Sequence, residues 1–160
     1  MRHTLTILIL LITLFQGLSQ QLTNEQKKSI VERHNFYRAI VGADSLVWSD
    51  NLEEEAEKCA EYMAEKPLLK CETSYGMNYY KYIDTIGVDS IVDIWAREQT
   101  LYYGQPITSE NILYLSHYSQ IIWKDTRQIG CALKKNKAGV LIFVCIYNPK
   151  GNIRGDKPTK

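Results

Sequence analysis

The last apolar stretch of the chain, Val140 to Tyr147, constrains the fold more than any other segment. Alternate residues of a β-strand point to opposite faces of a sheet. Here both alternating sets are apolar: Val140, Ile142, Val144 and Ile146 on one face, and Leu141, Phe143, Cys145 and Tyr147 on the other. A strand that is apolar on both faces is buried on both faces. The sequence therefore predicts a sheet that is covered by helices on each side.

Two cysteines flank a predicted hairpin that adds a second strand to this sheet. The turn is Asn136 to Gly139, and position 138 is the midpoint between Cys131 and Cys145. The two cysteines should therefore face each other across the strands, and we predict a disulfide between them. A Cys59–Cys71 disulfide follows by elimination, because the chain has four cysteines. The hairpin also makes the sheet at least partly antiparallel.

Apolar residues at helical spacing predict the layers on either side of the sheet. The expected N-terminal caps are Thr23, which forms a capping box with Gln26, then Ser49 and Asp89. The helix that begins near Asp89 should continue to Tyr102, and a further helix contains His117. We therefore expect an α/β (α+β) fold, a three-layer α-β-α sandwich with a mainly antiparallel central sheet.

Residues 1–19 have the pattern of a signal peptide. A basic start precedes an apolar run, Leu5 to Phe15, which is shorter than the roughly 20 residues that a membrane-spanning helix needs. Gly17 and Ser19 are small residues at the spacing that signal peptidase requires, so we predict cleavage after Ser19. A short membrane anchor is the alternative. Cleavage would leave a single secreted domain at residues 20–160, with a short C-terminal tail and no integral membrane segment.

Charge and cysteine spacing exclude two classes of protein. The formal net charge of +1 provides no basic surface for a nucleic acid, so we expect no nucleic acid partner. The four cysteines show neither a CxxC spacing nor a Cys/His cluster, which argues against a zinc finger. In the oxidising environment of a secreted protein they are expected to pair. We expect the domain to be a monomer.

Two segments together resemble the signatures of the CAP superfamily: SHYSQIIWKDT at Ser116 to Thr126, and FVCIYNPKGNI at Phe143 to Ile153. This superfamily comprises cysteine-rich secretory proteins, insect antigen 5 and plant pathogenesis-related class 1 proteins. Two residues depart from its signatures, because Ser116 stands where glycine is usual and Ile146 where asparagine is common. The resemblance covers nearly the whole mature chain and implies a three-layer sandwich of the CAP-domain type.

The resemblance also implies a central cleft, which in several family members binds zinc through two histidines and two glutamates. Glu98 and His117 match two of these four positions. Met77 stands where the family has the other glutamate, and the segment Lys66 to Ser74 has no histidine for the last position. Zinc prefers four protein ligands, or three and a water. We therefore expect a degenerate cleft without a metal or another cofactor. His34, on the first helix, is expected to have a packing role.

The first functional hypothesis is a secreted binding protein for a sterol, another lipid or an extracellular receptor, acting in defence or host interaction. Several CAP proteins bind sterols or fatty acids, and the sterol-binding members carry an aromatic loop. The corresponding segment here, SYGMNYYKYI, is rich in tyrosine, whose ring is apolar and whose tip is polar. Its candidate contact residues are Tyr75, Tyr79, Tyr80 and Tyr82. The alternative is that a chain with 11 tyrosines is simply rich in them.

The other two hypotheses are a hydrolase and a peptide precursor. A hydrolase would need a nucleophile beside His117, but the cysteines are expected to pair. Ser116 and Ser119 point away from His117 on a helix, so we expect no catalytic residue. The segment Pro149 to Lys160 resembles the tail from which plant members can release a signalling peptide. An ordinary tail with turn residues is the alternative.

Overall fold

The computed structural model describes residues 21–83 and 86–160, so the predicted signal peptide lies outside the described residues. The elements follow in the order α1 (Asn24–Ile40), β1 (Val47–Trp48), α2 (Asp50–Glu65), β2 (Gly76–Tyr82), α3 (Val88–Ala96), the 3-10 helix η1 (Arg97–Leu101), α4 (Ile112–Ile121), β3 (Gln128–Lys135) and β4 (Leu141–Asn148). Within the described ranges, no helix combines the length and the apolar character that crossing a membrane requires.

The four strands form one sheet in the order β1-β3-β4-β2. β4 lies between β3 and β2 and is antiparallel to both, whereas the short β1 runs parallel to β3. Every residue of β4 from Leu141 to Tyr147 is buried. The prediction of a mainly antiparallel sheet around a doubly buried strand is confirmed.

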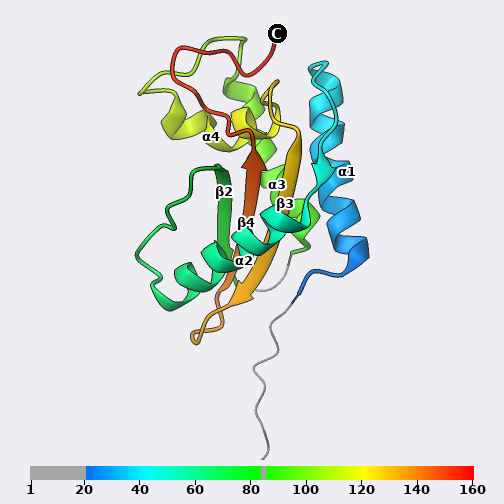
Figure 1. Ribbon diagram of the computed structural model, residues 1–160. Helices are drawn as coiled ribbons and strands as arrows, with labels where there is room; N and C mark the ends of the chain where they lie inside the picture. Colours follow the sequence, from blue (N-terminus) through cyan, green and yellow to red (C-terminus); the bar gives the residue numbers. More distant parts are fainter. Residues whose placement is uncertain (1–20, 84–85) are drawn as a thin grey trace, which may run out of the picture.

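Helices cover both faces of this sheet (Figure 1). α2 lies along β3 and β4 on one face, where the core consists of residues such as Leu52, Ala56, Met63, Val144 and Ile146. The core of the other face is supplied by α1, α3 and α4 and includes Ile30, Ile91, Trp95, Ile121 and Phe143. The result is the expected three-layer sandwich, in which the apolar stretch of β4 contributes to both cores.

The structure contains both predicted disulfides. Cys131 of β3 lies directly opposite Cys145 of β4, and the two are bonded. Cys59 of α2 is bonded to Cys71, which lies in the connection that leads to β2. The first bond joins two neighbouring strands, and the second fixes a connection that borders the candidate site.

Gly130 of β3 explains how closely α2 approaches the sheet. A Cβ atom at this position would lie 2.2 Å from the backbone nitrogen of Glu53 and 2.4 Å from the carbonyl carbon of Leu52. Both atoms belong to the backbone of the first turns of α2, so a flexible side chain cannot move aside. Glycine is therefore required where the helix begins against the strand.

α2 begins directly after its predicted N-cap, Ser49, whereas both ends of α3 differ from the predicted ones. The capping box of Thr23 and Gln26 is present, but the side chain of Ser49 makes no capping hydrogen bond at α2. α3 begins after Gly87, so Asp89 lies in its first turn and not at its cap. The α-helix ends at Ala96, and the chain continues as the tighter helix η1. Because η1 is also helical, the apolar spacing of the sequence predicted one longer helix that reached Tyr102.

The tyrosine-rich segment is a strand and not a loop. It forms β2, whose aromatic residues suit a pleated surface. Because side chains alternate along a strand, the tyrosines divide between two layers. Tyr80 and Tyr82 pack against the core beneath α1, α3 and α4, whereas Met77 and Tyr79 pack on the side of α2. The four tyrosines therefore do not form one surface.

The C-terminal segment is part of the folded domain and not a free tail. The backbone N–H of Lys124 donates to the carbonyl of Pro158 at 2.6 Å. Ile107 exchanges two hydrogen bonds with the same segment, donating to Asp156 and accepting from Gly155, each at 2.9 Å. These bonds hold the chain end against the connection that precedes α4.

Candidate functional site

The structure brings Glu98 of η1 and His117 of α4 into direct contact. Nδ1 of His117 lies 2.6 Å from Oε1 of Glu98. An ionised carboxylate only accepts, so Nδ1 carries the hydrogen and donates it. The other oxygen, Oε2, accepts from the backbone N–H groups of His117 and Tyr118, each at 2.9 Å. Both oxygens of Glu98 are thus engaged, and they fix the orientation of the imidazole.

Aromatic stacking fixes the same ring from one face. The His117 and Trp95 rings are parallel within 1°, with centroids 5.7 Å apart, and Trp95 stacks in turn on Phe143 of β4. Trp95 is buried, whereas 34% of the His117 side chain is exposed. The imidazole therefore rests on the core and keeps an accessible edge, which carries Nε2.

That edge borders an open cleft of ≈ 430 Å³ between β2, which is an edge strand, and α4. The cleft is lined by Tyr75, Met77 and Tyr79 on the strand side, by Ile112, Ser116 and His117 on the helix side, and by Lys70 and Lys150 from two connections. The structure thus places the predicted residues Met77, Tyr75 and Tyr79 beside His117. Tyr80 and Tyr82 do not line this cleft.

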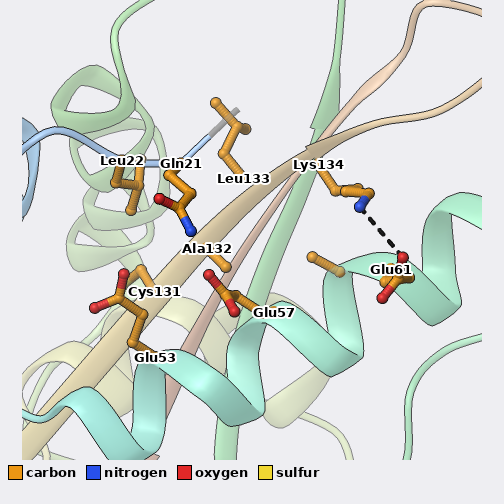
Figure 2. Close-up of a pocket in the computed structure, with 10 residues that line it drawn as sticks. Gln21, Leu22, Glu53, Glu57, Glu61, Cys131, Ala132, Leu133 and Lys134 are labelled. Atoms are coloured by element: carbon orange, nitrogen blue, oxygen red, sulfur yellow. Dashed lines mark hydrogen bonds and ion pairs between the residues drawn. The ribbon is translucent and has the colours of Figure 1, made fainter. Parts of the chain in front are cut away.

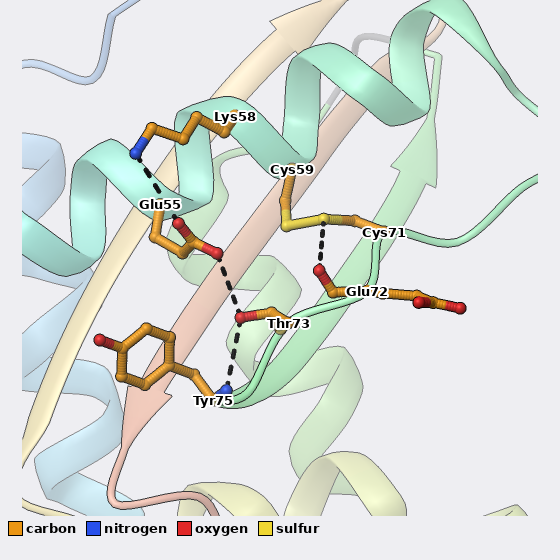
Figure 3. Close-up of a disulfide and its surroundings, with 7 residues drawn as sticks. All are labelled: Glu55, Lys58, Cys59, Cys71, Glu72, Thr73 and Tyr75. Atoms are coloured by element: carbon orange, nitrogen blue, oxygen red, sulfur yellow. Dashed lines mark hydrogen bonds and ion pairs between the residues drawn. A yellow bond between two sulfur atoms is a disulfide. The ribbon is translucent and has the colours of Figure 1, made fainter.

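The connection from α2 to β2 forms one wall and is fixed in several places. Figure 3 shows the Cys59–Cys71 disulfide that joins it to α2. Next to this bond, the hydroxyl of Thr73 donates to the carboxylate of Glu55 at 3.2 Å and accepts from the backbone N–H of Tyr75 at 3.4 Å. These contacts determine where the chain enters β2 and hence where Tyr75 lies.

The segment after β4 forms the opposite wall and is held by α4. The buried amide of Gln120 accepts a hydrogen bond from the backbone N–H of Gly151 at 2.9 Å. Asn152 has a positive φ of 60°, a conformation that asparagine tolerates well, and its amide donates to the carbonyl of Ser116 at 2.9 Å. Lys150 precedes these two anchored residues and is thereby placed at the cleft.

Lys70 and Lys150 are cleft residues that sequence analysis missed. They lie in connections without helical or strand periodicity, far apart in the chain. Lys150 does follow Pro149 inside the second signature segment, which is the one sequence signal that could have drawn attention to it. For Lys70 the sequence offers no such signal, because the disulfide next to it decides its position.

The donors in this cleft do not fit a zinc ion. His117 has only Nε2 to offer, and both oxygens of Glu98 are already engaged. The thioether of Met77 is a soft ligand and replaces a carboxylate poorly. In the part of the chain that the structure describes, no three His, Cys, Asp or Glu side chains are close enough together to hold a metal ion.

The groups that a hydrolase would use are engaged elsewhere. All four cysteines are in disulfides. The buried hydroxyl of Ser119 donates to the carbonyl of Leu115 at 2.6 Å and also contacts Asn152. Ser116 lines the cleft, but it neighbours His117 along α4, where adjacent side chains point apart. This arrangement does not form a nucleophile and base.

A second hollow, between α2 and β3, is too small to compete with the cleft (Figure 2). Its volume is ≈ 80 Å³, and its walls include Glu57, Leu22 and Ala132. This volume is well below the roughly 300–1,000 Å³ that is typical of small-molecule sites.

Two other open hollows are larger than the cleft, at ≈ 590 Å³ each: one lies between α2 and the β3–β4 hairpin, and the other lies beside the Cys59–Cys71 disulfide. Neither is lined by His117. The cleft is therefore the candidate functional site because of its oriented imidazole and not because of its volume.

Comparison with known proteins agrees with this architecture. The family model "CAP: Cysteine-rich secretory protein family" matches residues 31–147. Pathogenesis-related protein 1A of Nicotiana tabacum is 29% identical over 134 residues, which cover 82% of this chain and 80% of that protein. Venom allergen 5 of Polybia scutellaris rioplatensis is 29% identical over 161 residues, which cover 83% of this chain and 78% of that protein.

Solved structures show the same fold. The hookworm platelet inhibitor superposes with a TM-score of 0.70 at 21% identity, covering 87% of this chain and 77% of its own. The crystal structure of NaASP2 with Zn2+ gives 0.72 at 18% identity, covering 87% of each chain. With the sandwich, the Glu98–His117 pair and the family match over residues 31–147 in agreement, the chain belongs to the CAP (cysteine-rich secretory protein) family.

Proposed function

We propose that this CAP-domain protein is a secreted, monomeric binding protein without catalytic activity, and that the cleft beside His117 is its ligand site. The observation that carries the proposal is that His117, oriented by Glu98, lines an open cleft, whose volume of ≈ 430 Å³ is compatible with a small-molecule site. Its central side chain is held by Glu98 and by the Trp95 stack before any ligand arrives. The two disulfides support secretion, because such bonds persist in oxidising compartments.

The candidate ligand is a sterol or another lipid, and an extracellular receptor is the alternative partner. Tyr75, Met77, Tyr79 and Ile112 give the cleft an apolar and aromatic wall. Tyrosine suits an amphipathic ligand because its ring packs against apolar surface while its hydroxyl stays hydrated. Of the four candidate tyrosines, Tyr75 and Tyr79 line the cleft, and these two are therefore the ones proposed to contact the ligand.

Replacing Tyr75 and Tyr79 together by serine is expected to weaken lipid binding by roughly 1–3 kcal/mol for each ring that the ligand buries. The reason is that both rings line the cleft, so their removal deletes contact area. The measurement is titration with a fluorescent sterol and a fluorescent fatty acid, together with mass spectrometry of lipids that co-purify with the secreted protein.

The matched control is the double variant Tyr103→Ser and Tyr114→Ser, which makes the same chemical change at exposed positions outside the cleft. Its affinity should equal that of the unchanged protein. If the folded Tyr75/Tyr79 variant also bound with unchanged affinity, the lipid site would have to lie elsewhere on the molecule.

A further inference from the structure

We infer that this cleft binds the phosphate group of an anionic ligand, and not a metal cation. The inference rests on the proposed function, because it assigns a ligand class to the same cleft. Three basic side chains line it, namely Lys70, Lys150 and His117. Among the described residues that form its walls there is no aspartate or glutamate. The charge of this surface is therefore positive at neutral pH.

The two lysines keep their charges available for a ligand. Some lysines of the domain pair with carboxylates, as Lys27 does with Glu53 at 2.6 Å and Lys134 does with Glu61 at 3.2 Å. In the described ranges, neither Lys70 nor Lys150 has such an ion pair. Both side chains are exposed at the cleft, where a bound anion would face two ammonium groups at once.

Glu98 supports anion binding although it is itself acidic. Its two oxygens face away from the ligand, towards Nδ1 of His117 and towards two backbone N–H groups of α4. Because Nδ1 donates to Glu98, Nε2 is the ring nitrogen that remains for a ligand.

Two glycines lie where the Lys150 segment packs closely against its neighbours. A Cβ on Gly151 would lie 2.8 Å from Cγ of Trp123, so the chain packs directly against this side chain just after the end of α4. A Cβ on Gly76 would lie 2.2 Å from Oε1 of Gln120 and 3.3 Å from Cα of Lys150. The start of β2, α4 and the Lys150 segment therefore meet closely, and the lysine is held beside the strand.

Lys70 is fixed from the other side of the cleft. It is the residue before Cys71, whose disulfide ties the connection to α2. Its ammonium lies 5.9 Å from the centroid of the Tyr79 ring, within reach of a cation–π interaction. Lys70 and Lys150 thus line the cleft from two separately anchored connections, and His117 lines it from α4, so three basic side chains are available to a small anionic group.

The test compares two sources of the same group, the free ion and a lipid headgroup. Calorimetric titrations at low ionic strength use inorganic phosphate, a short-chain lysophosphatidic acid and cholesterol as probes. The double variant Lys70→Gln and Lys150→Gln is expected to weaken binding of the phosphate-bearing probes by at least about tenfold, because each lost charge removes a charge-assisted contact. Cholesterol, which has no anionic group, should bind the variant and the unchanged protein alike.

The matched control is Lys135→Gln with Lys137→Gln, which removes the same charge from the exposed end of the β3–β4 hairpin, outside the cleft. It should leave the affinity unchanged. Binding of inorganic phosphate would identify the free ion as sufficient, and Lys-dependent binding of the lipid alone would identify the headgroup as the source. Absence of saturable binding by both phosphate probes, or equal loss in both double variants, would overturn the inference. Cholesterol binding would still test the proposed function separately.

Discussion

Replacing Arg38 by methionine is expected to lower the free energy of unfolding by about 3–5 kcal/mol, because four backbone carbonyls would lose a buried, charged donor. Arg38 of α1 is fully buried. Its guanidinium donates to the carbonyls of Asp44, Ile121, Trp123 and Thr126 at distances of 2.6 to 2.9 Å. Methionine has a similar length but no donor, so these four acceptors would remain buried without this partner.

The position of Arg38 strengthens this expectation. Ile121 is the last residue of α4, so the guanidinium meets the negative end of the helix dipole. Burial lowers the pKa of Arg38 to about 10, and the side chain is still charged at neutral pH. Through these bonds it joins α1 to the end of the helix that carries His117.

Chemical denaturation measures the effect, with Arg33→Met as the matched control on the same helix. The Arg33 side chain is 36% exposed and pairs with Asp93 at the surface, so its replacement should cost about 1 kcal/mol or less. If both variants lost the same small amount, the buried network of Arg38 would not contribute as its geometry indicates. Arg38→Lys, which keeps a charge but not the planar set of donors, should fall between methionine and arginine.

Acidification from about pH 7 to about pH 4 is expected to remove about 3 kcal/mol of stability through His34 alone. His34 is fully buried, and burial lowers its pKa from 6.5 to about 4. Nδ1 lies 2.8 Å from the carbonyl of Ile30 and Nε2 lies 2.9 Å from the hydroxyl of Tyr147. The carbonyl only accepts, so Nδ1 carries the hydrogen and the neutral Nε2 accepts from the tyrosine.

The direction of this pH effect follows from the protons that the folded and unfolded states bind. Above about pH 6.5 the imidazole is neutral in both states, and the native network contributes its full stability. As the pH falls from about 6.5 to about 4, the unfolded chain binds a proton that native His34 does not, so stability decreases. The difference between the pKa of His34 in the unfolded chain, 6.5, and in the native state, about 4, corresponds to about 3 kcal/mol of stability. Below about pH 4 the native state also takes the proton, and the loss is complete.

The variant His34→Gln isolates this contribution from that of the carboxylates, which titrate in the same range. Glutamine retains a neutral acceptor for Tyr147 but does not titrate. The difference in unfolding free energy between the two proteins should therefore change by about 3 kcal/mol between about pH 7 and about pH 4. A constant difference over this range would show that His34 is not the responsible group.

The features predicted correctly from the sequence are those that depend on local pattern. The doubly apolar run of β4 required cover on both faces, and the placement of Cys131 and Cys145 around the turn at Asn136 fixed the register of the hairpin. The capping box at Thr23 began α1 where it was expected. In each case neighbours in the chain carry the relevant information, so periodicity and turn chemistry are sufficient.

The missed features depend on contacts between distant segments. The four partners of Arg38 lie in two separate stretches of the chain, and nothing at Arg38 itself indicates that it is buried. Lys70 and Lys150 meet at one cleft because a disulfide and the Gln120 amide place their connections there. The tyrosine-rich segment was expected as a loop, although pairing with β4 makes it a strand.

The Glu98–His117 contact lies between these two cases. The resemblance identified both residues, and the structure shows the hydrogen bond between them. The resemblance could not show that Oε2 of Glu98 accepts hydrogen bonds from two backbone N–H groups of α4. Because of these bonds, this oxygen is not free to bind a metal ion. With both oxygens of Glu98 engaged, the cleft lacks a free carboxylate for a cation, and His117 is held as part of the cleft wall.

We propose that the cleft beside His117 contacts its ligand through side chains of the protein and does not hold zinc. Isothermal titration of the purified protein with zinc near neutral pH tests the lack of zinc binding most directly, with His117→Ala as the companion variant. We expect no stoichiometric zinc binding at submicromolar affinity, because one imidazole nitrogen and a thioether leave most of the coordination shell to water. Submicromolar, one-to-one binding that is abolished by His117→Ala would contradict the claim.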